Sequence, residues 1–143
     1  MKLEEQGISI GDSKEDKKQR KQFIKDFYKL WETINPKKQV FNKSLKENIS
    51  VKYISVDETA GQASHRYKST LAIMFLTEIL EKAVKKGQPQ NSNPQKENQK
   101  GFEKIILMEY SQKDFGKIKL TVGVKRGTKE KIQYCVTAIE NDQ

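Results

Sequence analysis

Apolar residues recur at helical spacing between residues 14 and 35, with lysines and acidic side chains at most of the other positions. The apolar positions are Phe23, Phe27, Leu30, Trp31 and Ile34. Ser13 or Asp12 can cap the first turn, and Pro36 prevents the helix from continuing beyond Asn35. The pattern predicts an amphipathic helix over residues 14–35.

A second helical run, over residues 67–86, is apolar on more than one side. Its apolar residues are Leu71, Met74, Phe75, Leu76, Ile79, Leu80, Ala83 and Val84. Ser64 can cap the start of this run, and Gly87 can end it. A helix with such a wide apolar surface is expected to be the most buried element of the fold.

Four segments have the β-branched and aromatic composition of strands. They are residues 49–56, 102–110, 117–125 and 131–139. Residues 57–68 are expected to form a loop that leads into the second helix. Turn-forming residues at 114–116 and 127–129 separate the last three strands, so a three-stranded meander is the natural connection.

The last two predicted strands contain the clearest alternation in the chain. Ile118, Leu120, Val122 and Val124 lie on one face of the first strand. Pairing Lys125 with Lys131 places Val124 opposite Ile132, Val122 opposite Tyr134 and Leu120 opposite Val136. A register shifted by one residue would turn Gln133 and Thr137 into the core, so the pattern favours the first register.

In that register the other face of the hairpin is basic and carries short hydroxyl side chains. Its residues are Lys117, Lys119, Thr121, Lys125, Lys131, Gln133, Cys135 and Thr137. Lysines beside hydroxyls on a rigid sheet can stabilise phosphate charge and donate hydrogen bonds to phosphate oxygens. The alternative is an ordinary solvated face of an antiparallel sheet.

These elements predict an α+β fold, in which two main helices pack on one face of a mostly antiparallel sheet of about four strands. Residues 1–13 are expected to be a flexible tail, and residues 14–140 a single domain. The segment 88–100, QPQNSNPQKENQK, has no large hydrophobic residue and predicts a disordered loop inside that domain.

The composition indicates a polyanionic partner. Lys and Arg number 28 against 19 Asp and Glu, which gives a net charge of +9 and favours RNA or another nucleic acid, with an anionic membrane surface as the second choice. No apolar run is long enough to span a membrane, and no secretory signal is recognisable. We therefore expect a cytoplasmic protein that is not a membrane protein.

Histidine and cysteine occur once each, as His65 and Cys135. They cannot supply the four ligands of a structural zinc site, and no cofactor-binding motif is present, so neither a metal nor a small-molecule cofactor is expected. His65 is the side chain best suited to general acid or base work near neutral pH, and Arg66 and Lys68 flank it. The alternative is a surface or capping histidine at the start of a helix.

The order of segments from residue 40 to residue 140 resembles that of a known nuclease-like domain. The similarity lies in the opening VFNKSLKENISVKYISVDETAGQASHRYK, the helix LTEILEKAV, and the strands FEKIILMEY, KIKLTVGVKRG and KIQYCVTAIE. It is a resemblance to the nuclease-like domains of phage polyvalent proteins, which are grouped with barnase, EndoU, colicin and RelE toxins as small RNases.

The resemblance implies metal-independent cleavage of RNA on the face of the sheet opposite the helices. On that view His65 transfers a proton, and Lys119 and Lys125 stabilise the charge at phosphorus. The side chains that orient the scissile phosphate or its 2′-hydroxyl would be Thr121, Gln133 and Thr137. The residues that would contact the rest of the nucleic acid are Arg66, Lys68, Lys117, Lys131 and Gln133. Tyr134 also resembles a tyrosine on the last strand of such domains, but the predicted register turns Tyr134 into the core.

Three functions remain open from the sequence. The first is a small endoribonuclease acting as a toxin or a phage or mobile-element effector, for which a cognate inhibitor protein would be a partner. The second is a nucleic-acid-binding module without chemistry. The third is a protein-interaction domain of a phage or mobile-element protein, in which the positive charge serves solubility.

Overall fold

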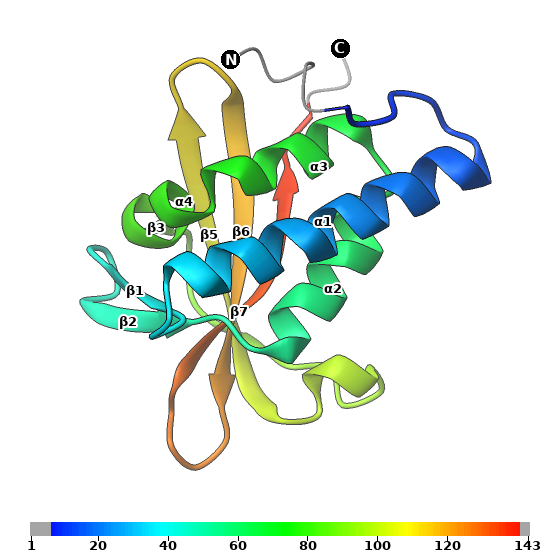
Figure 1. The fold of residues 1–143 in the computed structure, drawn as a ribbon. Coiled ribbons are helices and arrows are strands. Elements are labelled where there is room, and N and C mark those ends of the chain that lie inside the picture. Colours follow the sequence, from blue (N-terminus) through cyan, green and yellow to red (C-terminus); the bar gives the residue numbers. More distant parts are fainter. Residues whose placement is uncertain (1–6, 141–143) are drawn as a thin grey trace.

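Helices cover one face of a twisted, mostly antiparallel sheet in the computed structural model, which describes residues 7–140 (Figure 1). The helices are α1 (Lys14–Ile34), α2 (Tyr53–Ala63), α3 (Tyr67–Ala72) and α4 (Leu76–Lys82). The Ser13 side chain caps α1 by accepting a hydrogen bond from the Asp16 N–H at 3.0 Å, as the sequence predicts. Within the described residues, no helix has both the length and the apolar content needed to cross a bilayer.

The sheet has the order β1-β2-β7-β6-β5-β3, with β4 paired to another part of β5. The strands are β1 (Gln39–Asn42), β2 (Glu47–Ser50), β3 (Val84–Lys85), β4 (Gln90–Asn91), β5 (Phe102–Gln112), β6 (Gly116–Lys125) and β7 (Lys131–Ala138). β2 and β7 are parallel and the other pairs are antiparallel. The α+β class and the C-terminal meander are confirmed, while the sheet has more strands than expected.

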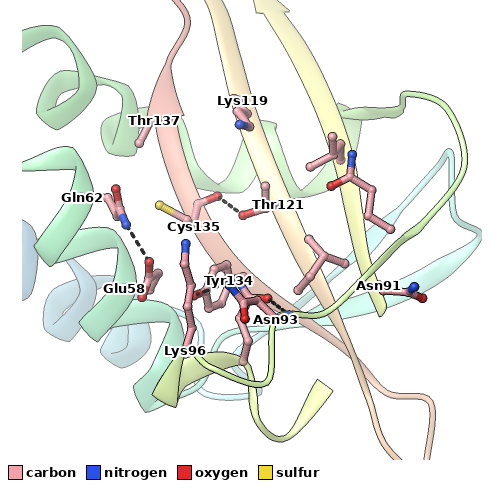
Figure 2. Close-up of a pocket in the computed structure, with 14 residues that line it drawn as sticks. Glu58, Gln62, Asn91, Asn93, Lys96, Lys119, Thr121, Tyr134, Cys135 and Thr137 are labelled. Carbon is pink, nitrogen blue, oxygen red and sulfur yellow. Dashed lines mark hydrogen bonds between the residues drawn. The ribbon is translucent and has the colours of Figure 1, made fainter. Parts of the chain in front are cut away.

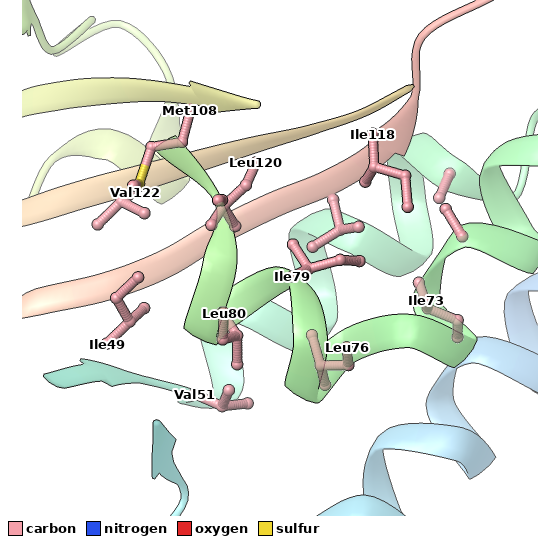
Figure 3. Packing of buried hydrophobic residues seen from close by; sticks show 14 of the residues in the cluster. Ile49, Val51, Ile73, Leu76, Ile79, Leu80, Met108, Ile118, Leu120 and Val122 are labelled. Carbon is pink, nitrogen blue, oxygen red and sulfur yellow. The ribbon is translucent and has the colours of Figure 1, made fainter. Parts of the chain in front are cut away.

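The main core lies between the helices and the sheet. Figure 3 shows side chains of α4, including Ile79 and Leu80, facing Leu120 and its neighbours on the sheet. These three side chains are fully buried, and each contributes about 1.5–3 kcal/mol relative to an exposed position. The core therefore fixes the helices over one face and leaves the opposite face for other contacts.

The prediction of a strand over residues 49–56 and a loop over 57–68 is wrong, because α2 occupies most of that stretch. The buried positions of α2 are Ser55, Thr59, Ala60 and Ala63, which repeat at helical spacing but are small or polar. The Ser55 side chain also accepts a hydrogen bond from the Lys52 N–H at 2.9 Å, so it starts the helix. The buried side of α2 therefore consists of small and hydroxyl residues, and a pattern of hydrophobic positions does not detect such a helix.

The second predicted helix is interrupted and shorter than expected. A 3₁₀ turn over Ile73–Phe75 separates α3 from α4, and α4 ends at Lys82. Val84 and Lys85 then form β3, and Gly87 adopts a positive φ of 71°. Arg66, not Ser64, occupies the N-cap position, because Ser64 closes α2.

The predicted register of the last hairpin is confirmed only in the part that contains Leu120 and Val136. Leu120 pairs with Val136, but a bulge at Thr121 and Val122 then places Val122 opposite Gln133 and Val124 opposite Lys131. The predicted pairs of Val124 with Ile132, Val122 with Tyr134 and Lys125 with Lys131 are wrong. The bulge turns Gln133 into the core and moves Ile132 and Tyr134 to the outer face.

A polar network explains why the core accepts Gln133. The Tyr28 hydroxyl donates to Gln133 Oε1 at 2.6 Å, and Gln133 Nε2 donates to Thr59 Oγ1 at 3.0 Å. Gln133 is fully buried, yet its amide is satisfied on both atoms, which removes most of the penalty for burying it.

On the outer face, Ile132 and Tyr134 join Phe102 and Ile105 in a second apolar cluster. The Phe102 ring crosses the sheet over Gly123, where a Cβ would lie 2.5 Å from three ring atoms. Only glycine leaves room for that ring. The predicted register implied a uniformly basic outer face. The outer face is instead apolar at this end of the sheet.

Two segments that the sequence predicts to be loose make specific contacts. Of the predicted tail, residues 7–13 lie within the structure, where Ile8 is buried and the Arg20 guanidinium binds the carbonyl oxygens of Ser9 and Gly11. Residues 1–6 lie outside the described part of the chain. In the segment 88–100, β4 pairs with β5 and Gln99 is buried, so polar contacts hold this segment against the outer face.

Candidate functional site

A pocket of about 400 Å³ lies on the outer face of the sheet, between α2 and the segment 88–100 (Figure 2). We call it the sheet pocket. Its lining residues are Glu58 and Gln62 of α2, Gln90, Asn91, Asn93, Lys96 and Gln99 of the segment, and Ile105, Leu107, Lys119, Thr121, Tyr134, Cys135 and Thr137 of the sheet. Its wall is thus rich in amides, hydroxyls and charges.

The sheet supplies Lys119 and Thr137 to this pocket as a cross-strand pair. These two residues are directly opposite each other on β6 and β7, and Thr121 lies opposite Cys135 two pairs further along, on the same face. The Thr121 hydroxyl donates to the Cys135 carbonyl oxygen at 3.4 Å. The strict alternation of β6 before the bulge places Lys119 and Thr121 outward, as the sequence predicts.

Helix α2 supplies an oriented carboxylate. Glu58 and Gln62 lie one helical turn apart, and Gln62 Nε2 donates to Glu58 Oε2 at 2.9 Å. Asn98 Nδ2 donates to Glu58 Oε1 at 3.0 Å, so both carboxylate oxygens have a partner. Glu58 is not among the predicted site residues, because residues 57–68 were expected to form a loop. The spacing of Glu58 and Gln62 is the signal in the sequence that points to it.

The segment 88–100 forms the wall opposite α2. The Asn93 N–H donates to Gln99 Oε1 at 2.6 Å, and Gln99 Nε2 donates to the Tyr134 hydroxyl at 3.4 Å. Lys96 is exposed and lines the pocket from this side. A second cation, which the sequence analysis did not single out, therefore joins Lys119 at the site.

A second hollow, of about 420 Å³, adjoins the sheet pocket and shares Gln62 and Thr137 with it. We call it the turn pocket, because it lies at the turn between α2 and α3. Its other lining residues are His65, Arg66, Ser69, Ala138 and Glu140. Together the two pockets make one groove along α2 and β7, to which the term groove refers below.

The backbone at His65 is held by a buried arginine. Arg20 Nε donates to the Ser64 carbonyl oxygen at 2.8 Å, and Arg20 Nη2 reaches the His65 carbonyl oxygen at 3.4 Å. The His65 side chain is exposed at the mouth of the turn pocket, and Arg66 pairs with Glu140 at 3.4 Å. Arg20 thus holds the backbone of this turn, while the side chains of His65 and Arg66 line the groove.

The groove brings together five of the residues that the sequence analysis selects. They are His65, Arg66, Lys119, Thr121 and Thr137. Gln133 is not among them: its selection as a nucleic-acid contact is wrong, since the bulge buries it on the opposite face.

The remaining four selected lysines line neither pocket. Lys131 forms an ion pair with Glu47 at 3.1 Å, and Lys68 Nζ lies 5.4 Å from the centre of the Phe115 ring. Lys117 and Lys125 occupy the two ends of β6, beyond the pocket residues. Of the two lysines to which the resemblance gives a catalytic role, only Lys119 reaches the groove.

No family model, curated protein or solved structure matches this chain. Within residues 7–140, no three His, Cys, Asp or Glu side chains gather in an arrangement that could hold a metal ion.

Burial suppresses the acidity of the two sheet residues at the floor of the pocket. Burial raises the pKa of the Cys135 thiol to about 12, and the Glu58 carboxylate adds to the effect. Burial also raises the pKa of Tyr134 to about 12. Near neutral pH the pocket therefore contains a neutral thiol and a neutral phenol, neither of which is a strong nucleophile.

Cys135 is expected to react with iodoacetamide at pH 8 more than tenfold more slowly in the folded protein than in urea. The raised pKa lowers the thiolate fraction about 1000-fold, and the greater nucleophilicity of a more basic thiolate offsets only part of this loss. Mass spectrometry of the alkylated product gives both rates. Glu58→Gln should increase the folded-state rate, whereas equal rates in folded and unfolded protein would contradict the burial of this thiol.

Proposed function

We propose that the chain is a small ribonuclease-like domain that binds RNA in the groove and cleaves it by proton transfer. The observation that carries the proposal is the alignment of Glu58, Gln62 and His65 along one wall of the groove, opposite Lys119 and Thr137. A carboxylate and an imidazole on one wall, with a cation facing them, are the groups that phosphodiester cleavage through the 2′-hydroxyl requires.

The proposed reaction follows from the places of these groups. The Glu58 carboxylate takes the proton of the 2′-hydroxyl, the 2′-oxygen forms a bond to phosphorus, and the bond from phosphorus to the 5′-oxygen breaks. The His65 imidazolium gives its proton to the departing 5′-oxygen. Glu58 lies about 8 Å along the helix axis from the end of α2, and His65 follows that end by two residues, so both side chains can reach toward one phosphate.

Cations and hydroxyls of the groove serve the phosphate. Lys119 and Lys96 face the site from two sides and offset the negative charge that grows on the phosphate oxygens. The Thr137 hydroxyl, shared by the two pockets, can donate to a phosphate oxygen held between Glu58 and His65. The amides of the segment 88–100 can hydrogen-bond the edges of an unpaired base.

A cleavage assay in EDTA with a fluorescent RNA oligonucleotide tests this function. Wild type is expected to cleave the RNA and to leave its 2′-deoxy counterpart intact, because the attacking oxygen is absent there. His65→Ala and Glu58→Gln should each lower the rate about 100-fold or more, the usual contribution of a general acid or base.

Lys119→Ala and Lys125→Ala form a matched pair for the same assay. Both remove a lysine from β6, but only Lys119 lines the groove, so only its removal should slow cleavage. Melting curves would confirm that all variants remain folded. Equal rates for all the variants, or cleavage of the deoxy substrate, would refute the proposed site.

Binding of nucleic acid without cleavage is a second candidate, favoured by one observation. Among the hydrogen bonds within residues 7–140, none involves the His65 imidazole, whereas catalytic histidines are commonly oriented by a partner. On this view the intact RNA is retarded in a gel, and its affinity falls steeply with added salt as counterions are released.

A further inference from the structure

A basic surface separate from the groove lies at the first turn of α2. His65 follows the other end of that helix. Tyr53 is the first residue of α2, and 82% of its surface is exposed to solvent. This is the largest exposed fraction among the exposed large apolar residues that the structure describes. Tyrosine rings are usually at least half covered in folded proteins. The ring therefore stands free on the surface.

Lysines surround this ring. Two shallow hollows of about 270 and 320 Å³ meet at Tyr53, and both are lined by Lys38 and Glu32. One hollow adds Lys37 and Lys52, and the other adds Lys25 and Lys29. Five lysines thus face Tyr53 with one glutamate, and we call this surface the lysine–tyrosine patch.

The backbone fixes part of the patch. Lys38 has a φ of 55°, its N–H donates to the Asn35 carbonyl oxygen at 2.8 Å, and its own carbonyl oxygen accepts from the Val51 N–H at 2.8 Å. These two bonds tie the end of α1 to the chain that enters α2. The Lys38 side chain is therefore presented from a rigid turn between the two hollows.

The end of α1 accounts for only some of these features. A lysine just beyond a helix C-terminus can neutralise its partial negative charge, which explains a cation at Lys37. That role requires neither the lysines on the far side of the hollows nor an uncovered aromatic ring. Lys52 is itself partly neutralised by Glu130, at 3.7 Å, so the patch retains a positive excess from the other lysines.

We propose that the lysine–tyrosine patch binds single-stranded nucleic acid, with an unpaired base stacked on Tyr53 and the neighbouring phosphates on Lys37 and Lys38. An exposed ring offers a flat face that any base can stack on, and lysines on both sides follow the backbone in either direction. A duplex keeps its bases paired and cannot use the ring. The proposal concerns a separate site from the groove and does not depend on cleavage there.

The length of α2 sets the distance between the two sites. Eleven residues make a helix about 16 Å long, so Tyr53 and His65 lie roughly that far apart. A single strand a few nucleotides long can span this distance. The patch would then hold one part of a strand while another part lies in the groove.

Fluorescence anisotropy with a labelled twelve-residue oligothymidine in low salt tests the patch. This probe has no 2′-hydroxyl, so cleavage cannot interfere. Tyr53→Ala is expected to weaken binding about tenfold, whereas Tyr53→Phe, which keeps the ring, should stay within about twofold of wild type. Because Tyr53 is exposed, neither change should alter the melting temperature.

A lysine pair supplies the electrostatic control. Lys37→Gln/Lys38→Gln should weaken binding and reduce the slope of log affinity against log salt by about one to two, while Lys85→Gln/Lys86→Gln, on exposed β3 and its flank, should change the slope less. Equal losses in the two double variants would mean that only net charge matters and would overturn the proposal.

Three further outcomes separate the alternatives. Glu58→Gln/His65→Ala should retain oligothymidine binding that is still sensitive to Tyr53→Ala, which would support the patch even if the groove proves inactive. Unchanged affinity in Tyr53→Ala would overturn the proposal. So would an oligoglutamate peptide that binds with the same dependence on Tyr53, since the patch would then be a surface for an acidic protein.

Discussion

Replacing Arg20 with alanine is expected to destabilise the protein by about 3–5 kcal/mol. Arg20 is fully buried, and its guanidinium donates to the carbonyl oxygens of Ser9, Gly11, Ser64 and His65. Those bonds join α1 to the residues before it and to the turn that follows α2. The loss would leave the buried Ser64 carbonyl oxygen and three partly buried carbonyl oxygens without this donor, and chemical denaturation would measure it.

A second variant separates the contribution of the guanidinium from that of the side chain's charge and bulk, and a third serves as a control. Arg20→Lys keeps a charge but cannot reproduce the planar fork, so most of the stability should still be lost. Arg126→Ala is the matched control, since Arg126 is exposed and donates from Nε to a single carbonyl oxygen at 3.2 Å. A loss for Arg20→Ala no larger than that for Arg126→Ala would contradict the role given to the buried guanidinium.

Gln133→Leu is expected to cost about 2–4 kcal/mol, although it replaces a polar residue in the core with an apolar one of similar size. The substitution removes the acceptor of the Tyr28 hydroxyl and the donor to Thr59. Both partners are buried, so water cannot replace what is lost. Equilibrium unfolding in urea would give the change.

A double-mutant cycle with Tyr28→Phe tests whether the two side chains act as a unit. The Tyr28 phenol has a raised pKa, because it is buried, and its proton stays available for the bond to Gln133. Once Tyr28→Phe has removed the hydroxyl, Gln133→Leu should cost at least about 1 kcal/mol less than it does alone. Strict additivity would show that the network does not stabilise the observed register.

Much of the fold could be predicted where one period dominates. The helix over residues 14–34 and the strands β5, β6 and β7 follow from apolar residues at regular spacing. Helix α2 could not be predicted, because its first residues are aromatic and β-branched and its buried face is made of small or hydroxyl side chains such as Ser55 and Ala60. Its helical period does not appear in hydrophobicity.

The candidate site shows the same division. Lys119, Thr121 and Thr137 could be placed from alternation alone, since they lie on the regular side of the bulge. Glu58 depends on α2 and was missed. Gln133 was misplaced because the benefit of burying its amide comes from a partner on α1, more than a hundred positions away in the chain. Local patterns contain no information on such a contact.

The position of β7 in the chain has a consequence for folding during synthesis. Residues 131–138 form a central strand of the sheet, and both α2 and α3 pack against it. The ribosome makes all four helices before β5, β6 and β7, so the faces of α2 and α3 that contact β7 stay uncovered until this strand has emerged. Contacts between segments so distant in sequence also form slowly. The nascent chain therefore passes through a stage in which it is rich in helix, lacks its sheet, and is most exposed to aggregation and to proteases.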